Sequence, residues 1–306
     1  MALRLVGDYN VSAPELALFG TENDGDGRSY KHPFRMNDNG KPLTVPSVTT
    51  VLKLEDKSAL IQWAADQSIL WAVDNWFLLG SRSSEDAFSA GRYAWSRVRD
   101  SRAQVGTGIH ETVEAEHTGS WNFPELDPEQ KQILEQWKLF NEEWIVEPVL
   151  SEFTVWSHEH DYAGTADGLW DLTNRQTGES FRSLIDIKTS RNLWPGHLMQ
   201  LAALKNADVR MVKAKPDAVK NSTGTWPEGS WIEVPNEKAD RVHLLQLRAP
   251  EYDKYDKVTK PAFYDLHEVT DLDLHWDKFV CYRNIWSAND ELKAREKLRE
   301  QSGSGF

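Results

Sequence analysis

Apolar residues recur every three to four positions in five segments of the chain, as they do along the buried face of an amphipathic helix. These segments are 48–76, 93–116, 128–144, 194–206 and 272–299. Ser47 is a suitable N-cap for the first helix, which the polar pair Glu55–Asp56 interrupts. Residues 80–90 are polar and predict a loop.

Three segments between the third and fourth helices have the composition of strands: 149–156, 163–172 and 181–188. Residues 174–179 are polar and include a glycine, so we expect a hairpin loop between the last two strands. Further strands are predicted at 231–234, 242–247 and 262–269, and Asn39–Gly40 has the sequence of a hairpin turn.

The order of these elements predicts a mixed α/β protein built as one domain over residues 1–300. Residues 46–145 form an N-terminal helical layer, 146–207 a core of strands and one helix, and 208–300 the C-terminal strands and helix. Residues 301–306 are rich in Gly and Ser and are expected to form a flexible tail.

Charged residues stand on the predicted strands where apolar ones would be expected. Asp186 and Lys188 are two positions apart, so on a strand their side chains point to the same face. Asp167 stands on the preceding strand. Burying such charges costs free energy unless they have partners. A divalent cation beside Asp167 and Asp186 would remove that cost, because hard cations bind carboxylate oxygens.

This arrangement resembles the PD-(D/E)xK nuclease superfamily, and its RecB-like exonuclease branch in particular. In that family an Asp on one strand and an acidic-x-Lys triplet on the next form a metal site. Ala166–Asp167 stands where the family has Pro-Asp, so the proline is missing, while Asp186-Ile187-Lys188 matches the triplet. The resemblance implies a restriction-endonuclease-like fold, with a mixed central sheet flanked by helices and the helical layer over the active site.

Three further matches follow the family's order: Gly106-Thr-Gly-Ile-His110, Gly164-Thr-Ala-Asp167-Gly, and Gln200 on the helix after the triplet. Leu204 stands where the family has a tyrosine, so only Gln200 is carried over as a DNA contact. The implied metal ligands are His110, Asp167, Asp186 and the Ile187 carbonyl, and the implied metal is Mg²⁺ or Mn²⁺.

Other roles that the resemblance implies involve residues beside the metal. Lys188 would orient the attacking water and stabilise charge on the phosphoryl oxygens, besides pairing with Asp186. Glu152 would serve as an accessory acid. Thr189 is interpreted either as a cap of the following turn or as a phosphate contact. His117, His158 and His160 have no comparable context and are interpreted as structural.

Composition narrows the class of protein. The chain of 306 residues contains one cysteine, Cys281, which excludes an intrachain disulfide and an iron–sulfur cluster held by four cysteines. Some relatives in the resembled branch carry such a cluster. No apolar run is long enough to span a membrane, and the first residues lack the pattern of a signal peptide. These features predict a cytoplasmic protein, in the bacterial host if a phage encodes it.

The net charge of −13 is unusual for a protein that binds nucleic acid, because phosphate contacts require Lys and Arg. Arginines nevertheless cluster at residues 92–102, just before His110, with Tyr93 and Trp95 between them. Arg92 and Arg99 are seven positions apart, so we expect them on one helical face that borders the site and contacts DNA. A solvated arginine face is the alternative.

The sequence therefore predicts a metal-dependent DNA exonuclease that processes DNA ends in recombination, repair or replication. Its expected partners are DNA and a single-strand annealing or other recombination protein. A structure-selective endonuclease with the same site, or a DNA-binding protein that keeps the fold without catalysis, are the alternatives.

Overall fold

A computed structural model describes residues 9–10, 27–55, 58–79, 83–120, 123–214, 231–253 and 255–301. The helices are α1 (Val48–Val51), the 3₁₀ helix η2 (Leu52–Leu54), α2 (Ser58–Asp74), α3 (Trp76–Leu79), α4 (Ser84–Arg92), α5 (Ala94–Thr118), α6 (Pro128–Glu143), α7 (Pro195–Asn206) and α8 (Leu272–Gln301). The strands are β1 (Tyr9–Asn10), β2 (Ser29–Met36), β3 (Pro42–Pro46), β4 (Trp144–Ser157), β5 (Tyr162–Asn174), β6 (Ser180–Lys188), β7 (Val209–Ala214), β8 (Trp231–Pro235), β9 (Arg241–Arg248), β10 (Glu251–Tyr252), β11 (Val258–Lys260) and β12 (Phe263–Glu268).

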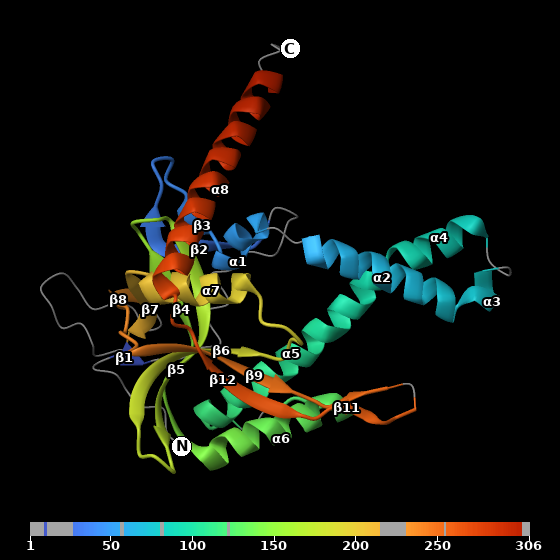
Figure 1. Ribbon diagram of the computed structural model, residues 1–306. Coiled ribbons are helices and arrows are strands. Elements are labelled where there is room, and N and C mark those ends of the chain that lie inside the picture. Colours follow the sequence, from blue (N-terminus) through green and yellow to red (C-terminus); the bar gives the residue numbers. More distant parts are fainter. Residues whose placement is uncertain are drawn as a thin grey trace, which may run out of the picture.

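A mixed central sheet organises the molecule (Figure 1). Its strand order is β1-β7-β4-β5-β6-β9-β12, and β8 pairs with β7 at one end. β6 and β9 run parallel, whereas the other neighbouring strands are antiparallel. The predicted α/β class, with a mixed sheet flanked by helices, is confirmed.

Each face of the sheet buries its own apolar cluster. α1, α7 and α8 cover one face and contribute residues such as Val51, Leu201 and Phe279. α5 and α6 cover the other, with Ile109 and Trp137 in the cluster (Figure 1). Most positions of β5 and β6 are therefore buried, so the few charges on these strands stand out.

The ends of the helices follow local capping chemistry. The side chain of Ser47 accepts a hydrogen bond from the Thr50 N–H, as its position in the sequence predicts. Asp127 and Gln130 form a reciprocal capping box before α6, with Pro128 in its first turn. Each cap thus satisfies an N–H group of the first helical turn with a side chain that is close in sequence.

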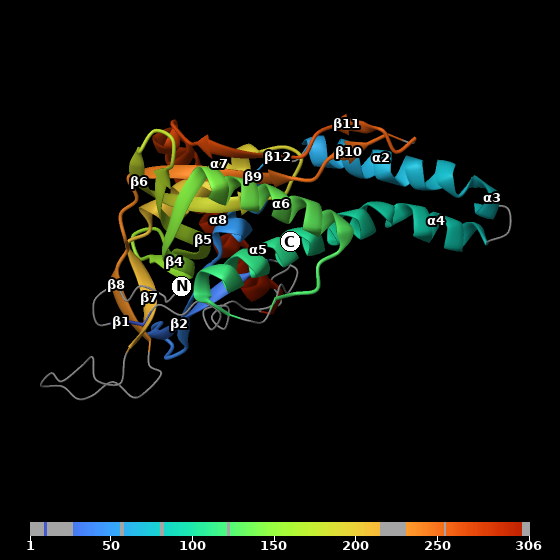
Figure 2. The same cartoon turned by 90° about the horizontal axis from the view of Figure 1, so that it is seen from below.

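The predicted loop over 80–90 is wrong for most of its length, because residues 84–92 form α4. Its N-cap is Ser83, whose hydroxyl accepts from the Asp86 N–H. With α2 and α3, this helix forms a projection that extends away from the sheet (Figure 2). Of the predicted helical layer, α1 and α5 border the site and α2 to α4 do not. The tail beyond Gln301 lies outside the described residues.

Candidate active site

The candidate site opens into a cavity of about 570 Å³. Its walls come from α5, from the start of α1 and from the segment that leads into β2. Four residues that the sequence singled out line it: His110, Glu152, Asp167 and Gln200. One helix, two neighbouring strands and a second helix therefore bring these side chains to a common space.

The site forms where β5 and β6 separate. Their ladder ends at the pair Gly168–Ile185. Beyond it, the Ile187 N–H donates to Oδ2 of Asp167 at 2.7 Å instead of to a backbone carbonyl. The Asp167 side chain thus replaces a strand partner, and the sheet opens beside it.

Asp186 and Lys188 lie next to this opening, on the face of β6 that α7 covers. The Lys188 ammonium is 2.6 Å from Oδ2 of Asp186, so the ion pair considered from the sequence is present. Gln200 of α7 donates to Oδ1 of the same carboxylate at 3.1 Å. Asp186 is only 1 % exposed, and these contacts fix its orientation.

Glycines bring the helix with His110 close to its neighbours. A Cβ atom at Gly108 would lie 2.3 Å from Nε2 of Gln130, at the start of α6. That amide donates to the Gln104 and Val105 carbonyls of α5. Gly106 lies near the hydroxyl of Thr189, which a Cβ would approach to 3.4 Å. The glycines therefore allow α5 to sit against both α6 and the end of β6.

His110 bridges the two separated strands. Its Nε2 lies 3.0 Å from the Ile187 carbonyl, and its Nδ1 lies 3.4 Å from Oδ2 of Asp167. A carbonyl oxygen can only accept, so Nε2 carries a hydrogen. In the neutral ring Nδ1 then keeps its lone pair, directed toward Asp167. A metal-bound histidine commonly donates its other N–H to such a backbone carbonyl.

Glu152 occupies a strained position opposite Asp167. Ser151 pairs with Gly168 and Phe153 with Ala166, which sets Glu152 across from Asp167. Its backbone φ of 45° lies in the left-handed region, which a non-glycine residue within a strand rarely adopts. Such strain is retained where the surrounding structure fixes it, often at functional sites. Glu152 therefore lies near Asp167, as predicted. A distortion of the strand backbone brings it there, and not the regular alternation of side chains along a strand.

The carboxylates and His110 shift one another's protonation. Burial, with added repulsion from Asp167, raises the pKa of Glu152 to about 8. Burial alone would lower the pKa of His110, but the charge of Asp167 outweighs it and raises this pKa to about 9. Burial would raise the pKa of Asp167, but the His110 charge outweighs it and keeps this pKa below its ordinary value.

The pKa values of Asp186 and Lys188 show the same balance between burial and neighbouring charges. Burial raises the pKa of Asp186 to about 6, and the Lys188 ammonium limits the rise. Burial would lower the pKa of Lys188, but Asp186 and Asp167 together raise it. Acidic groups that repel one another in a cleft are typical of functional sites.

The donor set suits a divalent cation. One donor atom from each of His110, Glu152 and Asp167 can be chosen so that all lie within 4.8 Å of one another. A cation there would relieve the repulsion that raises the pKa of Glu152 and would replace the proton on His110. Carboxylate oxygens suit Mg²⁺ and Mn²⁺, and an imidazole nitrogen is better suited to Mn²⁺.

The residues that the sequence predicts to contact DNA belong to different elements of the structure. Arg92 ends α4 and Arg99 belongs to α5, with the non-helical Tyr93 between them, so the argument from one helical face is wrong. Arg99 lies over the Trp95 ring and pairs with Asp100. The backbone carbonyl of Thr189 accepts from Arg248. None of these contacts tests a role in DNA binding, which stays a prediction.

Sequence reasoning missed several cavity residues. Glu114 is four positions after His110 and lines the same cavity, so helical spacing could have indicated it. Arg28 and Tyr30 come from the N-terminal hairpin, and the Tyr30 hydroxyl lies 2.9 Å from that of Thr165. Nothing in the local sequence predicts this contact across the chain.

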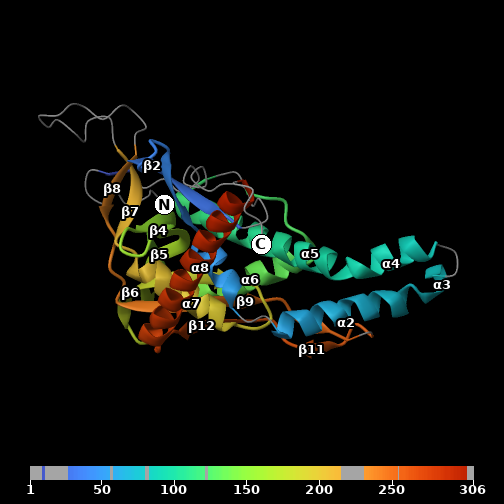
Figure 3. The same cartoon turned by 90° about the horizontal axis from the view of Figure 1, so that it is seen from above.

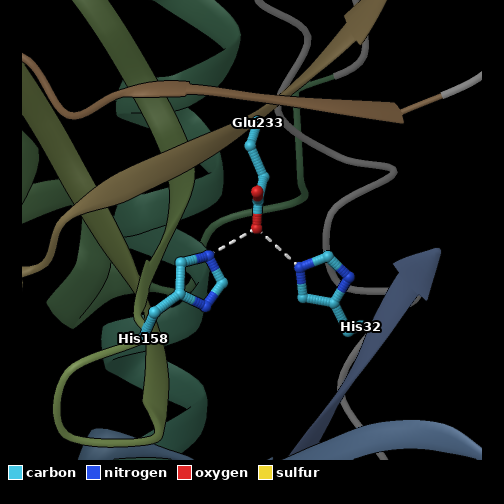
Figure 4. Close-up of side chains that lie close together, drawn as sticks. All are labelled: His32, His158 and Glu233. Atoms are coloured by element: carbon cyan, nitrogen blue, oxygen red, sulfur yellow. Dashed lines mark hydrogen bonds and ion pairs between the residues drawn. The ribbon is translucent and has the colours of Figure 1, made fainter. Parts of the chain in front are cut away.

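A second histidine–carboxylate group lies elsewhere, and we call it the clasp: His32 of β2, His158 after β4 and Glu233 of β8 (Figure 4). Oε1 of Glu233 is 2.7 Å from Nε2 of His32 and 2.6 Å from Nε2 of His158. Oε2 accepts from Arg35 at 2.8 Å. The clasp therefore joins three segments that are distant in sequence. His158, which the sequence predicts to be structural, is one of its members.

Comparison with known proteins leaves the family open. No family model matches this chain, and no curated protein matches it in sequence. Among the described residues, no helix is both long enough and apolar enough to cross a membrane.

Proposed function

We propose that this protein is a Mg²⁺- or Mn²⁺-dependent deoxyribonuclease of the PD-(D/E)xK type that degrades DNA from its ends. The observation that carries the proposal is the meeting of His110, Glu152 and Asp167 at the point where β5 and β6 separate, beside the Asp186–Lys188 pair. The order of α6, β4, β5, β6 and α7 also agrees with the core of a restriction-endonuclease-like fold.

His110, Asp167 and Glu152 would hold the cation, and Asp186 and the Ile187 carbonyl would be its further oxygen ligands. When bound, a divalent cation would activate water and neutralise charge on the scissile phosphate. Gln200 keeps the Asp186 carboxylate in place through its hydrogen bond. This support matters because an unpaired carboxylate buried to this degree would otherwise become protonated.

Lys188 would act on the substrate rather than on the protein alone. Its ammonium is held beside Asp186 and stays charged at neutral pH because both aspartates raise its pKa. A fixed positive charge near the scissile phosphate stabilises the negative charge that develops there during hydrolysis. Arg28, a cation in the cavity lining, would bind a second phosphate group through its planar guanidinium.

Degradation from an end fits the dimensions of the cavity. Its volume of about 570 Å³ lies within the range of small-ligand pockets and suits a short piece of single strand better than a duplex. On α5, Arg99, Ala103, Gly106 and His110 follow at spacings of four, three and four, which places them on one face. DNA would approach His110 along this face.

Incubation of the protein with end-labelled linear DNA and matched circular DNA, with Mg²⁺ or with EDTA, tests the proposal. We expect loss of label from the linear substrate in Mg²⁺, no cleavage of the circle, and no activity in EDTA. Cutting of the circle would indicate an endonuclease. Binding without cleavage of either substrate would contradict the enzymatic proposal.

A further inference from the structure

Three cations surround one carboxylate at the start of the hairpin formed by β10 and β11. Glu251 of β10 pairs with Arg191, and its Oε1 lies 3.3 Å from Nη2 of Arg248 and 3.7 Å from Nζ of Lys260. We call these four residues the Glu251 cluster. One carboxylate does not neutralise three cations, so the cluster keeps an excess of positive charge on a protein whose net charge is −13.

The ratio of cations to carboxylates is reversed at another arginine of the sheet. Arg182 of β6 faces two carboxylates, those of Asp171 and Glu237. In the Glu251 cluster the cations are in excess, and the side chains of Arg191 and Lys260 are 61 % and 56 % exposed. Exposed ion pairs of this kind add little to stability. The surplus charge is therefore available to an anionic ligand.

The Glu251 cluster adjoins the cavity of the candidate active site. Nη1 of Arg248 donates to the Thr189 carbonyl at 2.7 Å, and Thr189 directly follows Lys188 in the chain. The hydroxyl of Thr189 lies close to Gly106, which is part of the cavity wall. Two contacts, at Thr189 and at Arg248, thus connect the cavity wall to the cluster. A strand of DNA that leaves the cavity beside Gly106 would reach these cations.

The segment that carries Arg191 is held in place by the end of β9. The Gln246 side chain donates to the Ser190 carbonyl at 2.7 Å and to the Arg191 carbonyl at 3.2 Å. The Ser190 hydroxyl donates to the Asn192 carbonyl at 2.9 Å. The link between β6 and α7 therefore has a fixed backbone. A surface that is ordered before it binds loses less conformational entropy when a ligand arrives.

Exposed aromatic residues stand beside the Glu251 cluster in the sequence. Trp194 ends the same link and is 46 % exposed, and Tyr252 follows Glu251 and is 49 % exposed. The hairpin of β10 and β11 extends on the same side of the sheet as α2 (Figure 3). Cations with aromatic rings between them are typical of surfaces that bind single strands, because only an unpaired base can stack on a side chain.

We propose that the Glu251 cluster and Trp194 bind a single strand of DNA next to the cavity, the cations through its phosphates and the indole ring by stacking on a base. Arg191 and Lys260 supply the phosphate contacts, and Glu251 holds the cations in position between binding events. This proposal rests on the proposed nuclease function, because it places the surface on the path of that enzyme's substrate.

The salt dependence of binding tests the phosphate contacts. Fluorescence anisotropy with a labelled oligothymidylate of about 16 nucleotides, in Ca²⁺ and between about 50 and 200 mM salt, gives the log–log slope. The double variant Arg191→Ala/Lys260→Ala should lower this slope by about 1.4 and weaken binding at 0.1 M salt about tenfold or more, because two phosphate contacts are lost. A slope equal to that of the parent would overturn the proposal.

The matched control is Arg295→Ala/Lys297→Ala, which also removes one arginine and one lysine from exposed positions. Both residues lie on the last turns of α8, far from β11 (Figure 1). The control should keep the slope and the affinity of the parent. An equal loss in the control and in the cluster variant would mean that the overall charge of the protein, and not this surface, determines binding.

Two single variants separate charge from stacking. Glu251→Gln should bind the oligonucleotide more tightly and with a steeper slope, because it removes the one negative charge of the cluster. Trp194→Leu should weaken binding about tenfold while the slope stays that of the parent, because it removes a stacking contact and no charge. Weaker binding by Glu251→Gln, or unchanged binding by Trp194→Leu, would contradict the assigned roles.

The same measurements distinguish this surface from the proposed nuclease function. A protein that shows the expected slopes in Ca²⁺ but cleaves no DNA in Mg²⁺ would contradict the nuclease function and leave the surface intact. A protein that degrades linear DNA while the cluster variant keeps the parent slope would contradict the surface alone. Tighter binding of a blunt duplex of equal length than of the oligonucleotide would overturn the assignment to a single strand.

Discussion

Two groups of histidine and carboxylate side chains lie in this molecule, and they differ in where their protons sit. At the candidate active site, His110 faces a backbone carbonyl with Nε2, so in the neutral ring Nδ1 keeps a lone pair toward Asp167. In the clasp, Nδ1 of His32 accepts the Arg35 N–H at 3.0 Å, so Nε2 carries the hydrogen and donates to Glu233. The first arrangement directs a nitrogen lone pair at the carboxylates, whereas in the second Nε2 of His32 directs a hydrogen at Glu233.

The two groups also differ in the charges that surround them. Glu152, Asp167 and Asp186 bring several carboxylates to the site, and their repulsion contributes to the raised pKa values of Glu152 and Asp186. In the clasp, one carboxylate faces two histidines and Arg35, which together keep the pKa of Glu233 low although burial would raise it. Unrelieved repulsion favours a metal, whereas a satisfied carboxylate favours a structural role. Residue types alone would not separate the two groups.

The largest expected effect comes from removing a carboxylate charge at the site. Asp186→Asn should lower DNA cleavage by at least about 10³-fold, because it removes a charge at nearly constant volume. Its thermal stability should fall as well, because one amide oxygen replaces the two carboxylate oxygens that face Gln200 and Lys188, so the cleavage rate is compared per folded protein. Asp265→Asn, an exposed position on β12, is the matched control. Cleavage at the parent rate by Asp186→Asn would show that the site is assigned wrongly.

Lys188→Ala should lower the cleavage rate by about 10²-fold or more, since it removes a fixed charge near the reacting phosphate. DNA affinity, measured with Ca²⁺ in place of Mg²⁺, should change little. If the loss of affinity accounts for the whole loss of rate, Lys188 serves only to bind phosphate.

A substitution in the clasp should lower the stability of the protein and leave catalysis nearly unchanged. Glu233→Gln keeps one acceptor oxygen but turns the other into a donor that faces either Arg35 or the histidines. We expect the free energy of unfolding to fall by about 1–3 kcal/mol, with the cleavage rate at saturating DNA nearly unchanged. Glu268→Gln, which disturbs only an exposed and distant pair with Arg241, should cost less than about 0.5 kcal/mol. Loss of cleavage in Glu233→Gln at full stability would reverse the roles of the two groups.

The pH dependence of stability should have opposite signs at the two groups. In the metal-free protein the pKa of His110 is about 9, above its unfolded value, so its contribution is full below pH 6.5 and is lost as the pH rises toward 9. Burial lowers the pKa of His32, so its contribution is full above pH 6.5 and is lost on acidification. Urea unfolding between pH 6.5 and 9 in EDTA should show a slope that His110→Gln reduces, while Glu152, whose pKa is raised to about 8, keeps a contribution of the same sign. An unchanged slope would contradict the His110–Asp167 pairing.

Local patterns predicted much of this fold. The strands β4 to β6 and the helices α5 to α8 occur near their expected positions, because periodicity and capping act within a few residues of sequence. Helix α4 was missed although Ser83 and Asp86 carry a cap that the sequence displays. The spacing of Asp186 and Lys188 also sufficed to place them on one face.

Features that depend on distant contacts could not be predicted. The left-handed backbone of Glu152 follows from how β4 pairs with β5 around Asp167, not from its neighbours in sequence. Arg28 reaches the cavity through the N-terminal hairpin. The clasp joins His32 and Glu233 across 201 positions, so His158 had no visible partner. Tertiary packing decides each of these placements.

Calorimetric titration with Mn²⁺ of the parent protein, Asp167→Asn and Glu233→Gln tests the distinction between the two groups most directly. The parent and Glu233→Gln should bind Mn²⁺ with similar affinity, because Nε2 of His32 carries a hydrogen in the clasp, and Asp167→Asn should bind it much more weakly or not at all. Loss of binding in Glu233→Gln with full binding in Asp167→Asn would place the cation at the clasp. That result, or a parent protein that binds no Mn²⁺, would contradict this account of the site.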